Sequence, residues 1–381
     1  MSGPDLRPVV ERLEAGRDAG WHLGVQIYVS RGGEMLLDAA IGESVPGRPL
    51  EVDDVMLWYS SGKPWTTVAV LQLWEQDRLG LDDLVADYVD GWGKGKEAAT
   101  IRQVLTHTAG FPMAGDPTYD ADVSFEEALA VTAGWPAAWE PGTMAGYHPA
   151  SGWRVLGAIV ERVDGRRIDR YLRDEVASPL GLADCHLGIP LDVQRGYGDR
   201  LAPVHWTGHR YPSMVEGGIQ MVPWRIDEVH NEPWHVAKVE PGGGMRGPAR
   251  QLGRFYESLL GLRPAILQPS TVEMMRAVHR WGLRDATFGT LTPWGLGVAV
   301  DFSGGTGWRA FGHGGMASSR AFADPELGLV TVMVANGLAN YFDAEQRVLE
   351  VTDAVYSAFG DEFAAHRRPI ESAKQALGLS T

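Results

Sequence analysis

The pattern of hydrophobic and polar positions predicts strands at both ends of the chain and helices between them. Residues 22–30 and 35–41 form two candidate strands, and the segment 31–34 that joins them reads Arg-Gly-Gly-Glu. Paired glycines permit the positive φ angles of a tight hairpin turn. The chain is therefore expected to open with an antiparallel pair of strands.

Helical periodicity dominates the middle of the chain. Val70, Leu73 and Trp74 lie at helical spacing, and Gly80 offers a C-terminal stop, which predicts a helix over residues 62–79. The other predicted helices share this apolar spacing or a capping residue, and they lie within residues 1–20, over 100–107 with Thr100 as N-cap, over 155–163 before Gly165, and over 251–262 and 343–359.

Strands return near the C-terminus. The pattern predicts one strand over residues 295–302. It also predicts a hairpin across Pro325 and Glu326, formed by residues 319–324 and 329–336. Strands at both ends with helices between them favour an α+β fold, an α/β sandwich whose mainly antiparallel sheet is built from the N- and C-terminal segments and flanked by helices. Alternating βαβ units with a parallel sheet are not expected.

This order of elements suggests three regions. Residues 1–60 and 248–381 are expected to form a discontinuous sheet domain, and residues 61–202 a mainly helical domain inserted into it. Residues 203–247 are rich in Trp, Pro and Gly and show little periodicity, which predicts a loop or lid. The active site is expected in the cleft between these regions.

Three tryptophans of the 203–247 segment are candidates for the wall of a binding pocket. Aromatic walls with few charges suit apolar acyl or aryl groups, although core packing is the alternative for each of these residues. They are Trp206, Trp224 and Trp234.

Composition and charge narrow the class of protein. The net charge of −15 argues against nucleic-acid binding, which requires clustered Lys and Arg. No apolar run approaches the roughly 18 residues that a membrane span needs. Residues 1–20 lack the apolar segment of a secretory signal, and the lone Cys185 suits a reducing compartment. We therefore expect a cytoplasmic protein without a membrane span or a nucleic-acid partner.

Ser60 and Lys63 form the first candidate for chemistry. Serine is a poor nucleophile until a base lies within hydrogen-bond reach, and a lysine three residues later can share its helical face. Apolar neighbours such as Trp58 and Trp65 would lower the pKa of the lysine toward neutrality. A Ser-x-x-Lys pair is common by chance, however, and an ordinary helix start is the alternative.

Further motifs follow this pair in order along the chain. The stretch 101–110 reads Ile-Arg-Gln-Val-Leu-Thr-His-Thr-Ala-Gly, Tyr147 comes next, and residues 313–315 read His-Gly-Gly. With these motifs the chain resembles the serine β-lactamase and penicillin-binding-protein superfamily, in particular its class C-like branch of family VIII esterases, D-aminopeptidases and related acyltransferases. Several motifs that agree in order are far more specific than any one of them.

The resemblance implies a role for each matching residue. Ser60 would attack a carbonyl carbon, and Lys63 and Tyr147 would pass its proton to the leaving group. A tyrosine is normally a weak base, so its role requires Lys63 nearby to favour the phenolate or to share the proton. The backbone N–H groups of Ser60 and Met316 would form the oxyanion hole.

Two departures from the family pattern bear on the substrate. His313 stands where β-lactamases carry a lysine, and a neutral imidazole supplies no permanent cation for a substrate carboxylate. Gly314 and Gly315 allow close backbone approach, so all three residues are expected to bind substrate. Pro149 stands where the family commonly has an asparagine that contacts the lysine. His148 is a further candidate for the cleft, with a structural role as the alternative.

These departures favour ester hydrolysis. We expect a serine hydrolase that forms an acyl-enzyme, most simply a carboxylesterase acting on small or medium apolar esters. An acyltransferase would use the same intermediate. Amidase, D-aminopeptidase or weak β-lactamase activity, and a non-catalytic ligand-binding role, are the remaining alternatives.

Two histidine pairs and one glycine motif are weaker signals. His205 with His209, and His230 with His235, have spacings that could suggest a metal, but neither pair lies in a clear helix. The Gly-x-Gly-x-x-Gly pattern at residues 242–247 lacks a surrounding βαβ unit and is interpreted as a flexible lid hinge. No metal and no cofactor are expected.

Overall fold

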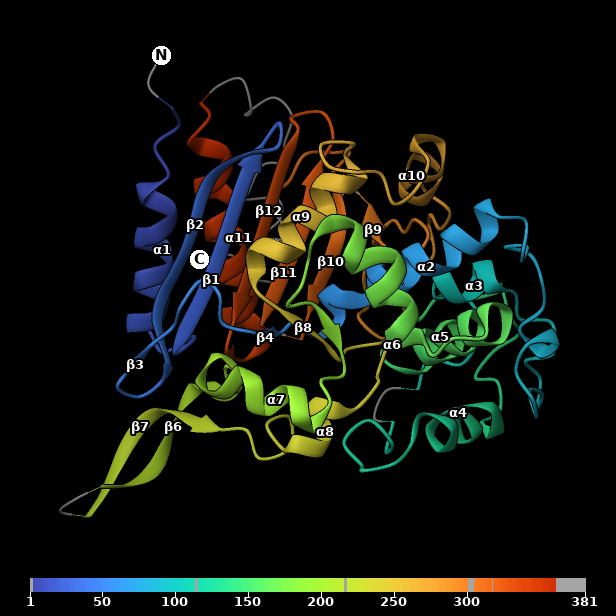
Figure 1. The fold of residues 1–381 in the computed structure, drawn as a ribbon, viewed down its shortest axis with the longest axis horizontal. Coiled ribbons are helices and arrows are strands. Elements are labelled where there is room, and N and C mark those ends of the chain that lie inside the picture. The colour runs from blue at the N-terminus through green and yellow to red at the C-terminus, as the bar shows by residue number, and fades with distance from the viewer. Residues whose placement is uncertain (1–2, 114–115, 216–217, 301–304, 317, 361–381) are drawn as a thin grey trace.

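A single antiparallel sheet joins the two ends of the chain. The computed structural model describes residues 3–113, 116–215, 218–300, 305–316 and 318–360. Seven of its strands pair in the order β3-β2-β1-β12-β11-β10-β9 (Figure 1). Their bounds are β1 Gly24–Arg31, β2 Glu34–Val45, β3 Arg48–Pro49, β9 Ala299–Val300, β10 Phe311–Gly315, β11 Ser319–Asp324 and β12 Leu329–Ala335. Because β1 pairs with β12, N- and C-terminal strands are neighbours, and the predicted fold class is confirmed.

The first hairpin forms as its glycines predict. Gly32 and Gly33 adopt φ angles of 60° and 82°, and Arg31 pairs with Glu34 across the turn. Such angles are unfavourable for residues with a Cβ, which is why glycine occupies both positions.

Helices cover both faces of the sheet. The helices α1 (Arg7–Asp18) and α11 (Tyr341–Ser357) lie together on one face, and α9 (Ala249–Leu259) lies on the other (Figure 1). Successive residues of β1 point to opposite faces. Ile27 belongs to the apolar cluster of α1 and α11, whereas Tyr28 belongs to the cluster of α9. The central strand is therefore buried on both sides.

The helical region holds the buried helix that begins at the candidate site. Its main elements are α2 (Lys63–Glu75), α3 (Ile101–Leu105), α4 (Phe125–Gly134), α5 (Ser151–Asp164) and α6 (Ile168–Tyr171). As predicted, Thr100 caps α3, in a capping box with Gln103, and α5 ends at Gly165 with a φ of 91°. The helix α2 is shorter than predicted and ends at Glu75.

The prediction of little regular structure in residues 203–247 is wrong. Strands β6 (His205–Val215) and β7 (Gly218–Ile226) form a ribbon that extends away from the body of the molecule (Figure 1), and α8 (Pro233–Ala237) follows. Strand β8 (Met245–Gly247) pairs with β4 (Met56–Leu57) and β5 (His186–Leu187), and β13 (Gly337–Leu338) pairs with β6. A two-stranded ribbon has open edges that tolerate the prolines which obscured it in the sequence.

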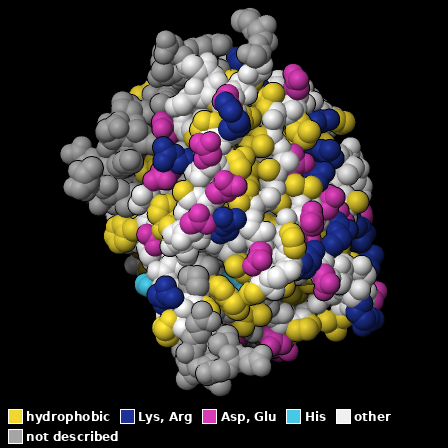
Figure 2. All heavy atoms as spheres, turned by 90° about the vertical axis from the view of Figure 1, so that its left-hand side faces the viewer, with side chains coloured by type: hydrophobic (Ala, Val, Ile, Leu, Met, Phe, Trp, Pro, Cys, Tyr) yellow, Lys and Arg dark blue, Asp and Glu magenta, His cyan; other side chains and the backbone are white. Residues whose placement is uncertain are grey.

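Two further helices and one short strand lie among the described residues. Helix α7 spans Leu191–Tyr197 and α10 spans Pro269–Arg276. Of the strand predicted over 295–302, only β9 forms, and residues 301–304 lie outside the described residues. Within the described ranges, no helix combines the length and the apolar character needed to cross a membrane. Figure 2 shows acidic and basic side chains interspersed among apolar ones on one face of the molecule.

Candidate active site

Ser60 lies in a short 3-10 turn, Tyr59–Gly62, directly before α2. Tyr59 has a φ of 50°, a left-handed conformation that is costly for a residue with a Cβ. Two hydroxyls hold this turn against the sheet: Ser61 Oγ donates to the carbonyl of His313 at 3.0 Å, and Ser319 Oγ donates to the carbonyl of Trp58 at 2.6 Å. The surrounding contacts thus fix a strained backbone next to the serine.

Gly315 allows strand β10 to approach the serine turn. A Cβ at this position would lie 2.3 Å from the carbonyl oxygen of Trp58 and 2.4 Å from Ser319 Oγ. The second glycine of the His-Gly-Gly motif is therefore required by close packing against the chain's own backbone, whereas the sequence had suggested backbone approach to a ligand.

Ser60 opens into a cleft of about 470 Å³. Most of the surface that lines the cleft is apolar. Its walls come from the serine turn, strand β10, the segment after Tyr147 and helix α11, and the lining side chains include Met113, Tyr147, Phe288, Trp294, Met316, Tyr341 and Val348. A pocket of this character suits an apolar ligand of small or medium size.

Lys63 is the first residue of α2, and its amino group faces Ser60. Nζ lies 3.2 Å from Ser60 Oγ and donates to the carbonyl oxygens of Pro149 and Gly242. The side chain is fully buried, and burial lowers the pKa of Lys63 to about 7, with Glu240 opposing the shift. Both protonation states of the amine are therefore populated near neutral pH.

Tyr147 lies on the other side of the serine. Its hydroxyl shares a hydrogen bond with Ser60, and its ring centroid is 5.5 Å from Lys63 Nζ. Burial raises the pKa of Tyr147, so the phenol is protonated at neutral pH. The sequence left open whether Lys63 favours the phenolate form of Tyr147 or shares a proton with its phenol. The protonated phenol found here fits the shared proton better. The backbone N–H of Tyr147 donates to Asp285 Oδ1 at 3.1 Å, which fixes this segment against the opposite wall.

The Leu-Thr-His-Thr-Ala-Gly stretch supports the tyrosine segment. The carbonyl of His107 accepts from the N–H of Gly146 at 3.0 Å, and its Nδ1 accepts from the N–H of His148 at 3.0 Å. The His107 ring centroid lies 4.6 Å from that of Tyr147. Burial lowers the pKa of His107 well below its usual range, so the ring is neutral. His107 of this motif therefore holds the backbone on both sides of Tyr147 in place.

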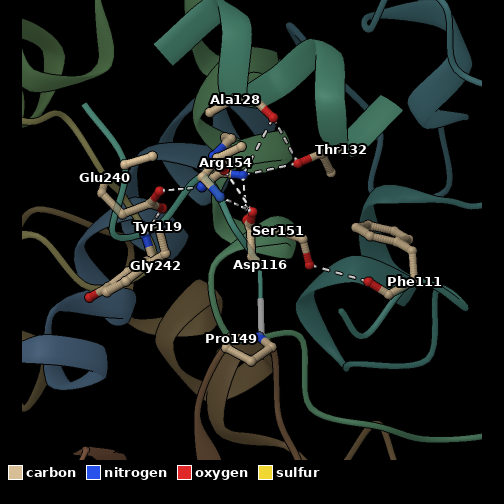
Figure 3. Close-up of polar contacts among 12 residues, drawn as sticks. Phe111, Asp116, Tyr119, Ala128, Thr132, Pro149, Ser151, Arg154, Glu240 and Gly242 are labelled. Carbon is tan, nitrogen blue, oxygen red and sulfur yellow. Dashed lines mark hydrogen bonds and ion pairs between the residues drawn. The ribbon is translucent and has the colours of Figure 1, made fainter. Parts of the chain in front are cut away.

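A buried ion network holds the Gly242 carbonyl in place (Figure 3). Arg154 of α5 forms ion pairs with Asp116 Oδ2 at 2.7 Å and Glu240 Oε2 at 2.5 Å, and Glu240 Oε1 accepts from the N–H of Gly242 at 3.2 Å. The Glu240 carbonyl accepts from the next two glycine N–H groups. The glycine run interpreted as a flexible hinge is thus a tight turn that contacts Lys63.

Sequence reasoning missed the role of two backbone carbonyls. Pro149 lacks the amide side chain of the family pattern, but its carbonyl accepts a hydrogen bond from Lys63, as does that of Gly242. Main-chain oxygens carry no signature of their own in a sequence. The run of three glycines after Pro241 was the only available signal of a close backbone approach here.

His313 lies on β10 in the wall of the cleft. Its Nδ1 donates to the carbonyl of Gly314 at 2.6 Å, so Nε2 of the neutral ring carries a lone pair. Burial, with the charge of Lys63, lowers the pKa of His313 to about 3. Gly314 lies opposite Arg320, which pairs with Glu345 at 2.7 Å. Met316 follows β10 and lines the cleft, as does Ser60.

Four residues expected in the cleft lie elsewhere. Trp206 packs against Leu57 and Tyr59 at the base of the ribbon, Trp224 pairs with Thr207 across it, and Trp234 lies on α8 beside Lys238. Trp206 and Trp224 thus belong to a strand pairing that sequence periodicity did not reveal. His148 is buried, and its Nε2 accepts from the N–H of Phe111 at 3.1 Å. None of these four side chains lines the described cleft.

Comparisons with known proteins identify the family of the chain. The model of the Beta-lactamase family matches residues 10–355. Esterase EstB of Burkholderia gladioli is 28% identical over 87% of this chain and 91% of its own length. Esterase/beta-lactamase LipL of Mycobacterium tuberculosis is 27% identical over 76% of this chain and 71% of its own.

A solved structure supports the same assignment. The penicillin-binding-protein homologue of Caulobacter crescentus superimposes with a TM-score of 0.75 at 27% identity, covering 94% of this chain and 99% of that protein. Together with a family match that spans most of the sequence, this likeness shows that the chain belongs to the Beta-lactamase family.

Proposed function

We propose that this protein is a carboxylesterase that acts on small or medium apolar esters through an acyl-enzyme on Ser60. The observation that carries the proposal is the 3.2 Å contact between Ser60 Oγ and Lys63 Nζ, whose pKa is about 7, at the edge of a mostly apolar cleft. The relatives EstB, named an esterase, and LipL, named an esterase/beta-lactamase, support ester hydrolysis.

The contacts of Lys63 favour its action as a base. A neutral amine has two N–H groups and one lone pair. The ammonium form donates to Ser60 Oγ and to the carbonyls of Pro149 and Gly242; in the neutral form the two carbonyls can keep both N–H groups, which leaves the lone pair for Ser60 Oγ, 3.2 Å away. In acylation, the serine proton passes to Nζ while Oγ forms a bond to the ester carbon.

Tyr147 is suited to return the proton. Its protonated phenol gives a proton to the leaving alkoxide as the bond between the carbonyl carbon and the alkoxy oxygen breaks, and it recovers a proton from the Lys63 ammonium. Water then attacks the acyl-enzyme by the reverse route and releases the acid. The N–H groups of Ser60 and Met316, two residues that line the cleft, would stabilise the oxyanion.

The neutral state of His313 directs the proposal toward neutral substrates. A cationic lysine at this place would attract the carboxylate of a β-lactam or peptide, whereas a neutral imidazole offers only a hydrogen bond. The nearby Arg320 is paired with Glu345, which offsets its charge. Uncharged esters are therefore the favoured substrate class.

A substrate panel tests the proposal. The purified protein would be assayed with p-nitrophenyl esters of increasing acyl length, with ampicillin, and with D-alanine amide, alongside Ser60→Ala and the control Ser357→Ala. We expect turnover of the esters that Ser60→Ala abolishes and Ser357→Ala retains. Turnover of ampicillin or the amide at rates comparable to the esters would refute the preference, and added alcohols that divert the product to new esters would reveal acyl transfer.

A further inference from the structure

Three potential metal ligands from two distant segments meet behind the serine turn. Asp120, His230 and His235 each offer a ligand atom, and these atoms all lie within 4.8 Å of one another. No metal was expected here from the sequence, because His230 and His235 do not lie in a clear helix. The fold brings them together instead through the turn before α8, and adds a carboxylate that is remote in sequence.

Both imidazoles are buried, and three of their four ring nitrogens have no hydrogen-bond partner among the described residues. His230 is 4% exposed and His235 is 6% exposed; His230 Nδ1 lies 3.1 Å from Asp227 Oδ1, whereas His230 Nε2 and both ring nitrogens of His235 make no hydrogen bond. A buried donor or acceptor without a hydrogen-bond partner costs free energy of folding. Its presence therefore requires an explanation, and a bound ion is one. The two rings lie close together, with centroids 4.8 Å apart.

His230 is flanked by carboxylates on both sides of its ring. Its Nε2 faces Asp120 Oδ1 at 3.6 Å, and its Nδ1 faces Asp227 Oδ1 at 3.1 Å. Asp227 is itself held by the backbone N–H groups of Val229 and His230. A metal-bound histidine characteristically presents its second nitrogen to a carboxylate that fixes the ring orientation, and Asp227 has this position.

The segment that carries Asp120 is held in place by Lys238. The Lys238 amine donates to the carbonyls of Thr118, Tyr119 and Ala121. Lys238 and the buried Arg246 lie near His235, and Asp227 is a carboxylate that opposes their charge there.

We propose that Asp120, His230 and His235 bind one divalent transition-metal ion, with Asp227 orienting His230. Two imidazoles and one carboxylate suit Zn²⁺ best among abundant ions, with a fourth position left for solvent. The ion would join the segment of Asp120 to α8, and Tyr119 of that segment lines the cleft. The site is structural and lies outside the proposed ester chemistry.

Metal titration of the full-length protein tests the site. After treatment with a chelator and its removal, Zn²⁺ binding would be measured by calorimetry, and Co²⁺ binding by visible absorption and by the rise in Tm. We expect one equivalent to bind. Asp120→Asn and His235→Asn are expected to weaken binding at least 10-fold, since even the loss of an orienting residue costs this much.

Control variants at residues outside the proposed site distinguish loss of a metal ligand from a general effect of substitution. Asp122→Asn removes an exposed carboxylate close to Asp120 in sequence, and His209→Asn removes an exposed imidazole of strand β6; both variants are expected to bind Zn²⁺ as the wild type does. Asp120 is exposed, so its asparagine variant is expected to fold even if the His235 variant does not. Absence of stoichiometric binding, or equal affinity in the wild type and Asp120→Asn, would overturn the proposal, and neither result would bear on the ester activity.

Discussion

Removal of Lys63 changes the pH dependence of stability in a way that the structure specifies. Burial lowers the pKa of Lys63 from 10.5 to about 7 in the folded protein. Between these values the unfolded chain holds a proton on the amine and the folded chain does not. The free energy of unfolding therefore rises with pH across this window: the stabilisation is complete above the unfolded pKa and is lost as the pH falls through about 7.

The expected size of the effect follows from the shift. Each pH unit inside the window contributes about 1.4 kcal/mol. Allowing for partial protonation near pH 7, the wild type is expected to gain about 2 kcal/mol relative to Lys63→Met between pH 7 and pH 9. Methionine preserves most of the side-chain length without the titratable group.

Urea unfolding at pH 7, 8 and 9 measures this difference. The control Lys94→Met removes a solvent-exposed lysine and accounts for the change in net charge. A free-energy difference between the wild type and Lys63→Met that stays constant over this range would show that the folded protein keeps Lys63 charged. The amine could then not take the proton of Ser60 in the resting enzyme, and the proposed mechanism would fail.

Three further substitutions test other parts of the site. Arg154→Leu leaves Asp116 and Glu240 buried without their cation and is expected to lower the free energy of unfolding by about 3–5 kcal/mol in urea; an unchanged value would contradict the network. Gly315→Ala forces strand β10 away from the serine turn and is expected to lower kcat about 10²-fold in a folded protein, as judged by circular dichroism. Tyr147→Phe is expected to lower kcat for esters by about 10²–10⁴, and an effect confined to KM would argue against proton transfer.

Local signals in the sequence predicted much of the fold. The Gly32-Gly33 hairpin and the Thr100 cap depend on backbone conformation and hydrogen bonds within a few residues, and both formed as expected. The β6–β7 ribbon did not follow from such signals. Its base is fixed by β13, which lies more than a hundred residues later, so the pairing depends on contacts that periodicity does not record.

Some residues of the candidate site could be identified from the sequence, and others could not. Ser60, Lys63 and Tyr147 were identified because side-chain chemistry and motif order are visible in a sequence, and the structure brings them together. The carbonyls of Pro149 and Gly242 were missed because every residue has one, and only the fold decides which point at Lys63. The pocket tryptophans were misplaced for a related reason, since composition does not show which surface an aromatic ring covers.

The central claim is that Ser60 becomes acylated, and its most direct test is the mass of the labelled protein. After incubation with a serine-directed p-nitrophenyl phosphonate, peptide mass spectrometry is expected to find one adduct, on Ser60, formed in step with the loss of esterase activity. Ser60→Ala is expected to show neither adduct nor turnover. An adduct on another residue, or undiminished ester turnover by Ser60→Ala, would contradict the account.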